Sequence, residues 1–126
     1  MTETPQDAVY ARVHATLLSL PGAVAETPFG PDSLVFKVGG KMYAILYYDQ
    51  RYVNLSLKVD PVEGEALRET WAAILPGYHL NKRHWITAIL DGTLPDDLID
   101  ELIHDSYQLV VKGLTRAARE SLSGTA

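Results

Sequence analysis

Two consecutive β-hairpins are encoded in the run SLVFKVGGKMYAILYYDQRYVNLSLKV, residues 33–59. Apolar and polar residues alternate along the segments 33–38, 42–48 and 53–59, and a period of two is typical of strands with one buried face. Gly39-Gly40-Lys41 and Asp49–Tyr52 separate these segments and carry residues that favour tight turns. The run therefore predicts a three-stranded antiparallel meander, to which a short strand at 23–27 adds a fourth strand.

Helices are expected on both sides of this meander. Thr4-Pro5, with apolar residues at helical spacing after it, predicts a first helix over 5–20, and the capping box that begins at Asp60-Pro61 predicts a second helix to about residue 74. A further strand at 85–90 precedes a third helix, which Pro95 opens and Gly113 closes. The order α-β-β-β(-β)-α-β-α predicts an α+β fold, an antiparallel sheet with helices packed on one face. We expect one domain over residues 1–126, with its core at about 5–114 and a C-terminal tail at 115–126.

Composition sets the class of the protein. The chain has 126 residues, of which 47% are hydrophobic and 21% charged, values that are ordinary for a globular domain. No apolar run approaches the roughly 20 residues of a membrane span, and the N-terminus lacks the pattern of a signal peptide. The absence of cysteine excludes disulfides, thiolate zinc sites and thiol catalysis. We expect a cytoplasmic monomer that holds no cofactor and no metal.

Charge is unevenly distributed along the chain. The formal net charge of −5 is unlike that of a strongly basic nucleic-acid-binding domain. Residues 91–105 hold six acids and no lysine or arginine, whereas residues 35–59 hold four bases and one acid. One face of the protein is therefore able to be basic while a helix elsewhere is acidic.

Pairing across the two turns divides the meander into two faces. A first loop of three residues and a second loop of four would place one set of cross-strand pairs on the same face, and this face is almost wholly apolar. The pairs are Val38–Met42, Phe36–Ala44, Leu34–Leu46, Tyr48–Val53, Leu46–Leu55 and Ala44–Leu57. The opposite face then carries Val35, Lys37, Tyr43, Ile45, Tyr47, Asn54, Ser56 and Lys58. Lysines and an amide beside two tyrosines are able to hold a flat or anionic molecule. The alternative is a solvated outer face on which tyrosines pack across strands.

A second candidate site is the loop Asn81-Lys82-Arg83-His84, directly before Trp85. Four donor or charged groups beside a strand are typical of a binding surface, and no structural requirement explains them. We expect this loop to contact a ligand and Trp85 to anchor its strand in the core.

Patterns of known catalytic and metal sites are missing from the sequence. The four histidines form no helical pair, and the acids of the third helix are best explained as its solvated face. Gly39-Gly40-Lys41 joins two strands and is not a phosphate-binding loop. We therefore expect a protein without enzymatic activity.

Several motifs together resemble the MmcQ/YjbR-like family. They are the hairpin run 38–42, the strand end 55–58, the stretch 76–85, the turn 90–92 with Pro95, and the run 105–110. The resemblance covers about residues 9–114. It implies a frataxin-like (CyaY-like) α+β arrangement and a double-wing mode of DNA binding, since members of the family are described as predicted DNA-binding proteins.

Two functions follow from these observations. The first is nucleic-acid (DNA) binding of modest affinity, with phosphate contacts from Lys37, Lys41, Lys58, Lys82 and Arg83, and with Tyr43 and Tyr47 available for stacking. The alternative is binding of a small anionic molecule or a partner, in a cleft lined by Tyr43, Asn54, Lys58 and the loop from Asn81 to His84.

Overall fold

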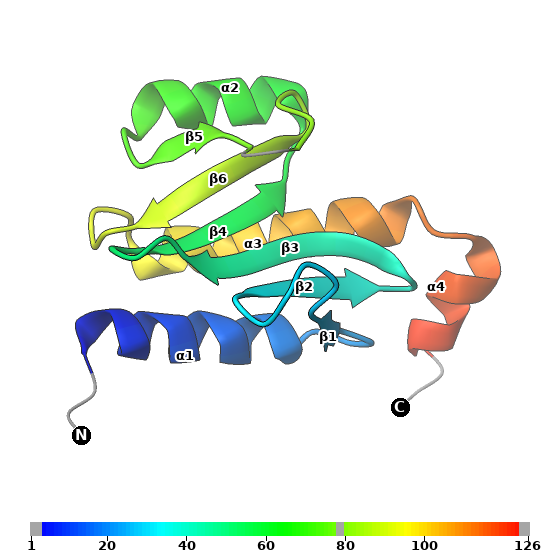
Figure 1. Ribbon diagram of the computed structural model, residues 1–126. Coiled ribbons are helices and arrows are strands. Elements are labelled where there is room, and N and C mark those ends of the chain that lie inside the picture. The colour runs from blue at the N-terminus through cyan, green and yellow to red at the C-terminus, as the bar shows by residue number, and fades with distance from the viewer. Residues whose placement is uncertain (1–3, 78–79, 124–126) are drawn as a thin grey trace.

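The two hairpins form the centre of a six-stranded antiparallel sheet (Figure 1). The computed structural model describes residues 4–77 and 80–123, so Tyr78 and His79 of the motif stretch 76–85 lie outside the described residues. Across the sheet the strands follow the order β1-β2-β3-β4-β6-β5. Their bounds are β1 Val24–Glu26, β2 Ser33–Val38, β3 Lys41–Tyr48, β4 Val53–Lys58, β5 Ile74–Pro76 and β6 Trp85–Leu90. The helices are α1 Pro5–Leu18, α2 Pro61–Thr70, α3 Asp96–Lys112 and α4 Arg116–Ser123.

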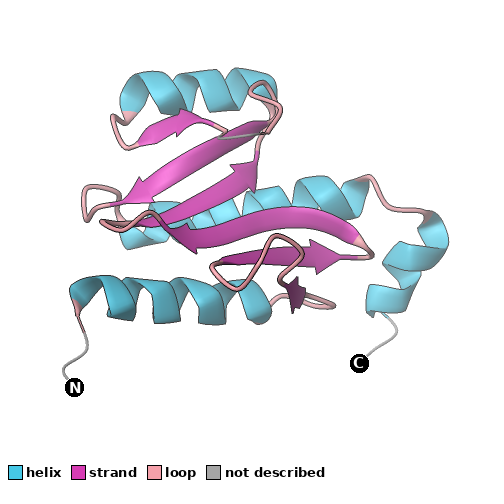
Figure 2. Cartoon of the chain, in the orientation of Figure 1, coloured by secondary structure: helices cyan, strands magenta, loops and turns pink. Residues whose placement is uncertain are grey.

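The predicted α+β architecture, with helices on one face of the sheet, is confirmed. In Figure 1, α3 runs behind the strands, α1 lies beneath them and α2 follows the β5 edge, and Figure 2 shows the same layers by type of element. Val13 and Leu17 of α1 and Ile103 of α3 are buried in one cluster with the apolar side chains of β2, β3 and β4. Full burial of one such side chain stabilises the fold by about 1.5–3 kcal/mol.

The helix starts are those expected from the sequence. The hydroxyl of Thr4 accepts a hydrogen bond from the N–H of Asp7 (3.0 Å), and the carboxylate of Asp7 accepts one from the N–H of Thr4 (3.1 Å). Asp60 accepts hydrogen bonds from the N–H groups of Val62 and Glu63 at the start of α2. These caps satisfy N–H groups that have no partner within the helix.

The end of α2 was predicted wrongly. The helix stops at Thr70, because Trp71 is extended. After a short turn, Ile74–Pro76 forms β5, where Ile74 pairs with Ala88 of β6. A three-residue strand that ends in proline is tolerated at a sheet edge, where one side needs no ladder partner. Sequence periodicity cannot reveal so short a strand.

The C-terminal tail contains a helix of its own, since Arg116–Ser123 forms α4. Gly22, in the turn after α1, has a φ of +73°, and the side chain of Leu122 from α4 packs where a Cβ atom would be. The left-handed conformation of this turn therefore favours glycine.

The first hairpin loop has two residues, not the three expected. Gly39 and Gly40 have φ values of +57° and +79°, the left-handed pair that a type I′ turn requires. Val38 consequently pairs with Lys41, and the predicted Val38–Met42 pair is wrong. A bulge at Tyr43 then restores the predicted pairing of Phe36 with Ala44. The register beyond it, including the second hairpin, agrees with prediction.

This bulge moves Tyr43 from the free face to the core, which corrects its assignment as a ligand-stacking residue. One extra residue in β3 lets both Tyr43 and Ala44 point toward the helices, and each has 0% exposure. The hydroxyl of Tyr43 donates a hydrogen bond to the carbonyl of Leu17 (2.7 Å), and its ring meets that of Tyr107 edge-on at 5.4 Å. Burial, followed by the neighbouring Tyr107, raises the pKa of Tyr43 above the usual tyrosine range.

A serine from α3 completes the junction beside the bulge. Tyr43 and Lys58 would be the next pair in the ladder between β3 and β4, after Ala44 and Leu57. Instead the buried hydroxyl of Ser106 donates to the carbonyl of Tyr43 (2.6 Å) and accepts from the N–H of Lys58 (2.8 Å). The Ser106 hydroxyl thus satisfies the Tyr43 carbonyl and the Lys58 N–H, which the bulge prevents from bonding to each other.

We expect Tyr43→Ala to lower the free energy of unfolding by about 3–5 kcal/mol, as other aromatic truncations in cores do. Phe36→Ala should cost a similar amount, and Tyr47→Ala on the opposite face clearly less. Denaturant titration measures all three variants. Equal losses for Tyr43 and Tyr47 would contradict the bulge and the face assignment.

A second stability test concerns the junction. Ser106→Ala leaves a buried N–H and a buried carbonyl without a partner, so we expect a loss of about 1–3 kcal/mol per group. Amide hydrogen exchange should show reduced protection of the Lys58 N–H. Protection of Lys58 as strong as in the parent would mean that another group replaces the serine hydroxyl. Ser19→Ala, in the exposed cap of α1, is the control.

Candidate functional site

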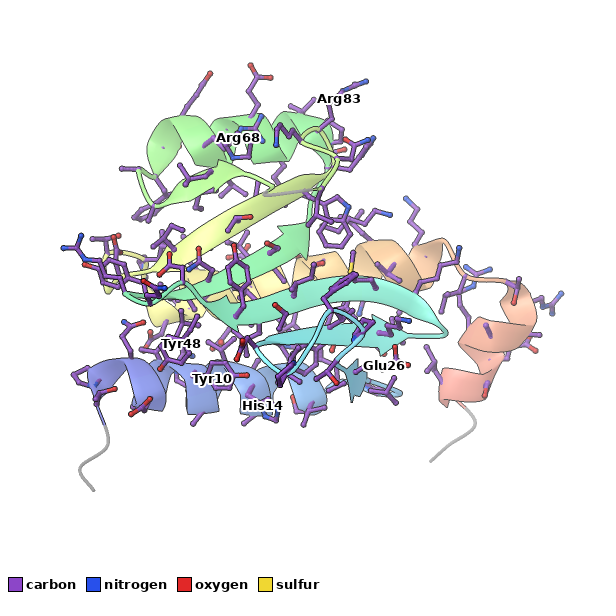
Figure 3. All side chains as sticks on the ribbon, viewed as in Figure 1. Tyr10, His14, Glu26, Tyr48, Arg68 and Arg83 are labelled. Carbon is purple, nitrogen blue, oxygen red and sulfur yellow. The ribbon has the colours of Figure 1, made fainter. Side chains whose placement is uncertain are left out.

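Within residues 4–77 and 80–123, one face of the sheet has no helix over it. Figure 1 looks onto this face, with α3 behind the strands and only the loop between β1 and β2 crossing in front. Figure 3 shows its side chains and labels Arg83, which projects from the loop before β6. The strand register places the following residues on the open face: Val35, Lys37, Ile45, Tyr47, Asn54, Ser56, Lys58, Leu75, Trp85, Thr87 and Ile89.

Three polar residues form the floor of the open face. Asn54, Ser56 and Thr87 are only 2%, 1% and 2% exposed, although they lie on the open face. The hydroxyl oxygens of Ser56 and Thr87 lie 2.9 Å apart and share a hydrogen bond. Short polar side chains are thus enclosed by the larger residues around them, unlike the solvated surface that was the alternative at this position.

A hollow of about 290 Å³ lies at one end of this floor. Asn54 and Thr87 line its base, and its sides are formed by Tyr47 of β3, Ile89 of β6, and Leu75 and Pro76 of β5. Tyr47 and Asn54 were both candidate residues from the sequence. Leu75 and Pro76 were missed because β5 was not predicted. Thr87 and Ile89 were missed because the predicted strand at 85–90 was not assigned a partner, and only the structure shows that it pairs with β4.

The rim of the hollow carries a negative charge. Asp49, in the turn after β3, accepts hydrogen bonds from the N–H groups of Tyr52 (2.8 Å) and Arg51 (3.0 Å). The pKa of Asp49 is lowered, first by the Tyr52 N–H and then by the side chain of Asn54. An ionised carboxylate at this end disfavours an anion in the hollow.

The opposite end of the face is basic. Lys58 pairs with Trp85, and the N–H of Val59 donates to the carbonyl of His84 (2.8 Å), so the loop from Asn81 to His84 adjoins the end of β4. Lys58, Lys82 and Arg83, here called the basic cluster, take part in none of the ion pairs found among residues 4–77 and 80–123. The cluster and the hollow are the two ends of one surface.

The loop before β6 has an internal order of its own. The amide oxygen of Asn81 accepts the N–H of Arg83 (2.9 Å), and the Asn81 carbonyl accepts the N–H of His84 (3.2 Å). The ammonium of Lys82 donates to the carbonyl of Gly77 (3.2 Å). Asn81 and Lys82 therefore both have hydrogen bonds that order the loop, while Arg83 projects away from it (Figure 3).

Other candidate residues do not join the cluster. The ammonium of Lys37 lies 2.7 Å from the carboxylate of Glu26, which neutralises it, and Lys41 lies at the tip of the first hairpin. Tyr43 is in the core, as described above. The cleft that would combine Tyr43 and Asn54 with Lys58 and the 81–84 loop is therefore not formed.

Trp85 lies on the open face, so its assignment as a core anchor was wrong. It is half-buried and precedes Ile86, Ala88 and Leu90, which alternate with it and face the helices. Its backbone carbonyl accepts the N–H of Gly77 (2.9 Å), where a Cβ atom would be 2.7 Å from that of Trp85. The alternation in β6 was the signal that could have placed this ring correctly.

A family model described as YjbR matches residues 18–109, which is most of the chain. The chain belongs to the YjbR family. Two relatives in Escherichia coli are YbdF of O157:H7, 37% identical over 99 residues, and YjbR of strain K12, 34% identical over 105 residues. The alignments cover 79% of this chain and 81% of YbdF, and 83% of this chain and 89% of YjbR.

Solved structures agree with this membership of the YjbR family. The crystal structure of the Deinococcus radiodurans protein DR2400 is 44% identical to the chain and superposes with a TM-score of 0.85, covering 97% of this chain and 92% of that one. A Pseudomonas syringae protein is 37% identical with a TM-score of 0.61, over 69% of this chain and 86% of its own. Among the residues that the structure describes, no helix has the length and apolar character needed to span a membrane.

The rim of the hollow gives a prediction about pH. Because the pKa of Asp49 is lower in the folded protein, its carboxylate stabilises the fold above its unfolded pKa of about 3.9, and this contribution is lost as the pH falls through the folded pKa. Asn54→Ala removes one cause of the lowering, so the pKa of Asp49 should rise toward its usual value. Carboxyl NMR titration measures this pKa, with Asp91, held by Thr93 in another turn, as the internal control. No change at Asp49 would show that the two side chains do not interact.

Proposed function

We propose that this YjbR-family protein binds nucleic acid, with DNA as the first candidate, through the open face of its sheet, and that it does so without catalysis. The observation that carries this proposal is the basic cluster of Lys58, Lys82 and Arg83 beside the half-buried ring of Trp85. Cations that lack an ion-pair partner are available for phosphates, and an aromatic ring next to them is suited to stacking with a base.

The net charge of −5 does not oppose this arrangement. The acids of α3 lie on the other side of the sheet, and two of them, Asp96 and Asp100, pair with Arg12 of α1. Local potential at a surface depends on the charges nearest to it more than on the sum over the molecule. The acidic balance limits the affinity, which supports binding of modest strength.

A small-molecule receptor is the second candidate, and the hollow beside Asn54 favours it. Its volume of about 290 Å³ lies near the lower end of the range of ligand sites. However, the ionised Asp49 at the rim disfavours the anionic ligand expected from the sequence. A neutral ligand that donates hydrogen bonds suits this hollow better.

The basic cluster is tested by replacing Lys58, Lys82 and Arg83 together with alanine. Folding should stay near that of the parent, because exposed charges contribute little to stability. Binding to labelled oligonucleotides should weaken, and the slope of log K against log salt should flatten by about 2.7 for a duplex or about 2.1 for a single strand. Fluorescence anisotropy at several salt concentrations measures both quantities.

The matched control replaces Lys112, Arg116 and Arg119, which removes the same charge from the α3–α4 region. The control should keep the slope of the parent. Equal effects of the two triple variants would assign binding to overall charge and not to the cluster. A parent protein that binds neither duplex nor single strand at low salt would overturn the proposed function.

A further inference from the structure

We propose that the hollow between Tyr47 and Leu75 receives one unpaired nucleobase of a single strand whose phosphates lie on the basic cluster. This inference rests on the proposed function and names its substrate class, single-stranded nucleic acid. It follows from three features of the hollow, which are its shape, its hydrogen-bonding groups and its distance from the cluster.

The shape of the hollow suits a flat ring. Its volume of about 290 Å³ is enough for a small planar molecule and too small for a folded or double-stranded segment. The ring of Tyr47 stands on one side, and the apolar side chains of Leu75 and Ile89 stand on the others. Aromatic and apolar walls of this kind hold an unstacked base, and each stacked base contributes to affinity without requiring a sequence.

The polar groups of the hollow are mainly acceptors. Asp49 is an ionised carboxylate at the rim, and the side-chain N–H₂ of Asn54 is engaged by the carbonyl of Tyr52 (3.0 Å). The amide oxygen of Asn54 is therefore the end that a ligand can use. A base that offers adjacent N–H donors on its pairing edge complements these acceptors, and guanine does so with its ring N–H and exocyclic amino group.

The two ends of the face favour different parts of a nucleic-acid strand. Asn54 and Lys58 both lie on the open face of β4, four residues apart, which corresponds to about 13 Å. Phosphates are repelled by Asp49 and attracted by Lys58, so a strand places its backbone at the cluster and a base in the hollow. A paired base cannot enter, because its edge is already hydrogen-bonded. Single strands should therefore bind more tightly than duplexes of the same length.

The hollow is tested first with nucleosides, which carry no phosphate. Guanosine added to ¹⁵N-labelled protein should shift the backbone amides of Tyr47, Thr87 and Ile89. Inosine, which lacks the exocyclic amino group, should bind several-fold more weakly. Asp49→Asn keeps a side-chain acceptor that can close the turn but removes the negative charge. It should reduce the difference in affinity between guanosine and inosine.

Oligonucleotide binding then tests the hollow within the strand. Leu75→Trp fills the hollow from an exposed position (46% exposed), and Leu18→Trp on α1 (41% exposed) is the matched control. We expect Leu75→Trp to weaken single-strand binding at least about fivefold, the lower end of what one stacked base contributes, with the salt slope unchanged. Leu18→Trp should bind as the parent does.

The outcomes separate this inference from the proposed function. If the parent binds oligonucleotides with a steep salt slope, but guanosine shifts no amide of the hollow and Leu75→Trp binds normally, the hollow is not a base site and the proposed function stands. Tighter binding of duplexes than of single strands overturns the inference in the same way. If the parent binds no oligonucleotide, the proposed function and the strand arrangement built on it both fail.

Discussion

The hydroxyl of Ser106 is the contact on which the arrangement of this protein depends. It bridges the Tyr43 carbonyl and the Lys58 N–H, and so holds α3, the bulge of β3 and the end of β4 in one junction. Tyr43 extends the junction to α1 through its hydrogen bond with the Leu17 carbonyl. A buried polar group is costly unless it is paired, so these three elements have one arrangement in which all the groups are satisfied.

The same junction shapes the surface on the other side of the sheet. Because the bulge moves Tyr43 into the core, the open face keeps Lys58 and Trp85 at one end without a second tyrosine between the strands. Lys58 is fixed through its own backbone N–H, which positions its side chain beside the loop before β6. Packing in the core and the geometry of the open face are thus two effects of one set of hydrogen bonds.

The two ends of the open face differ in charge, which the net charge of the whole protein does not show. One end carries the positive charges of the basic cluster, and the other end combines an acidic rim with apolar walls and a buried polar floor. A ligand that is anionic at one point and flat and uncharged about 13 Å away is complementary to both ends. Single-stranded nucleic acid has this combination, whereas a small anion is complementary to the basic end alone.

The sequence by itself determined the α+β class, the helix starts at Thr4 and Asp60, the second hairpin and most of the core face, because caps, turns and alternation are local signals. It also carried the motifs of the YjbR family. Only the tertiary structure decided the face of Tyr43, since a two-residue loop with a bulge and a three-residue loop give the same register beyond them. It alone placed β5, and therefore the hollow, because a three-residue edge strand carries no periodic signal and exists only through its pairing with β6.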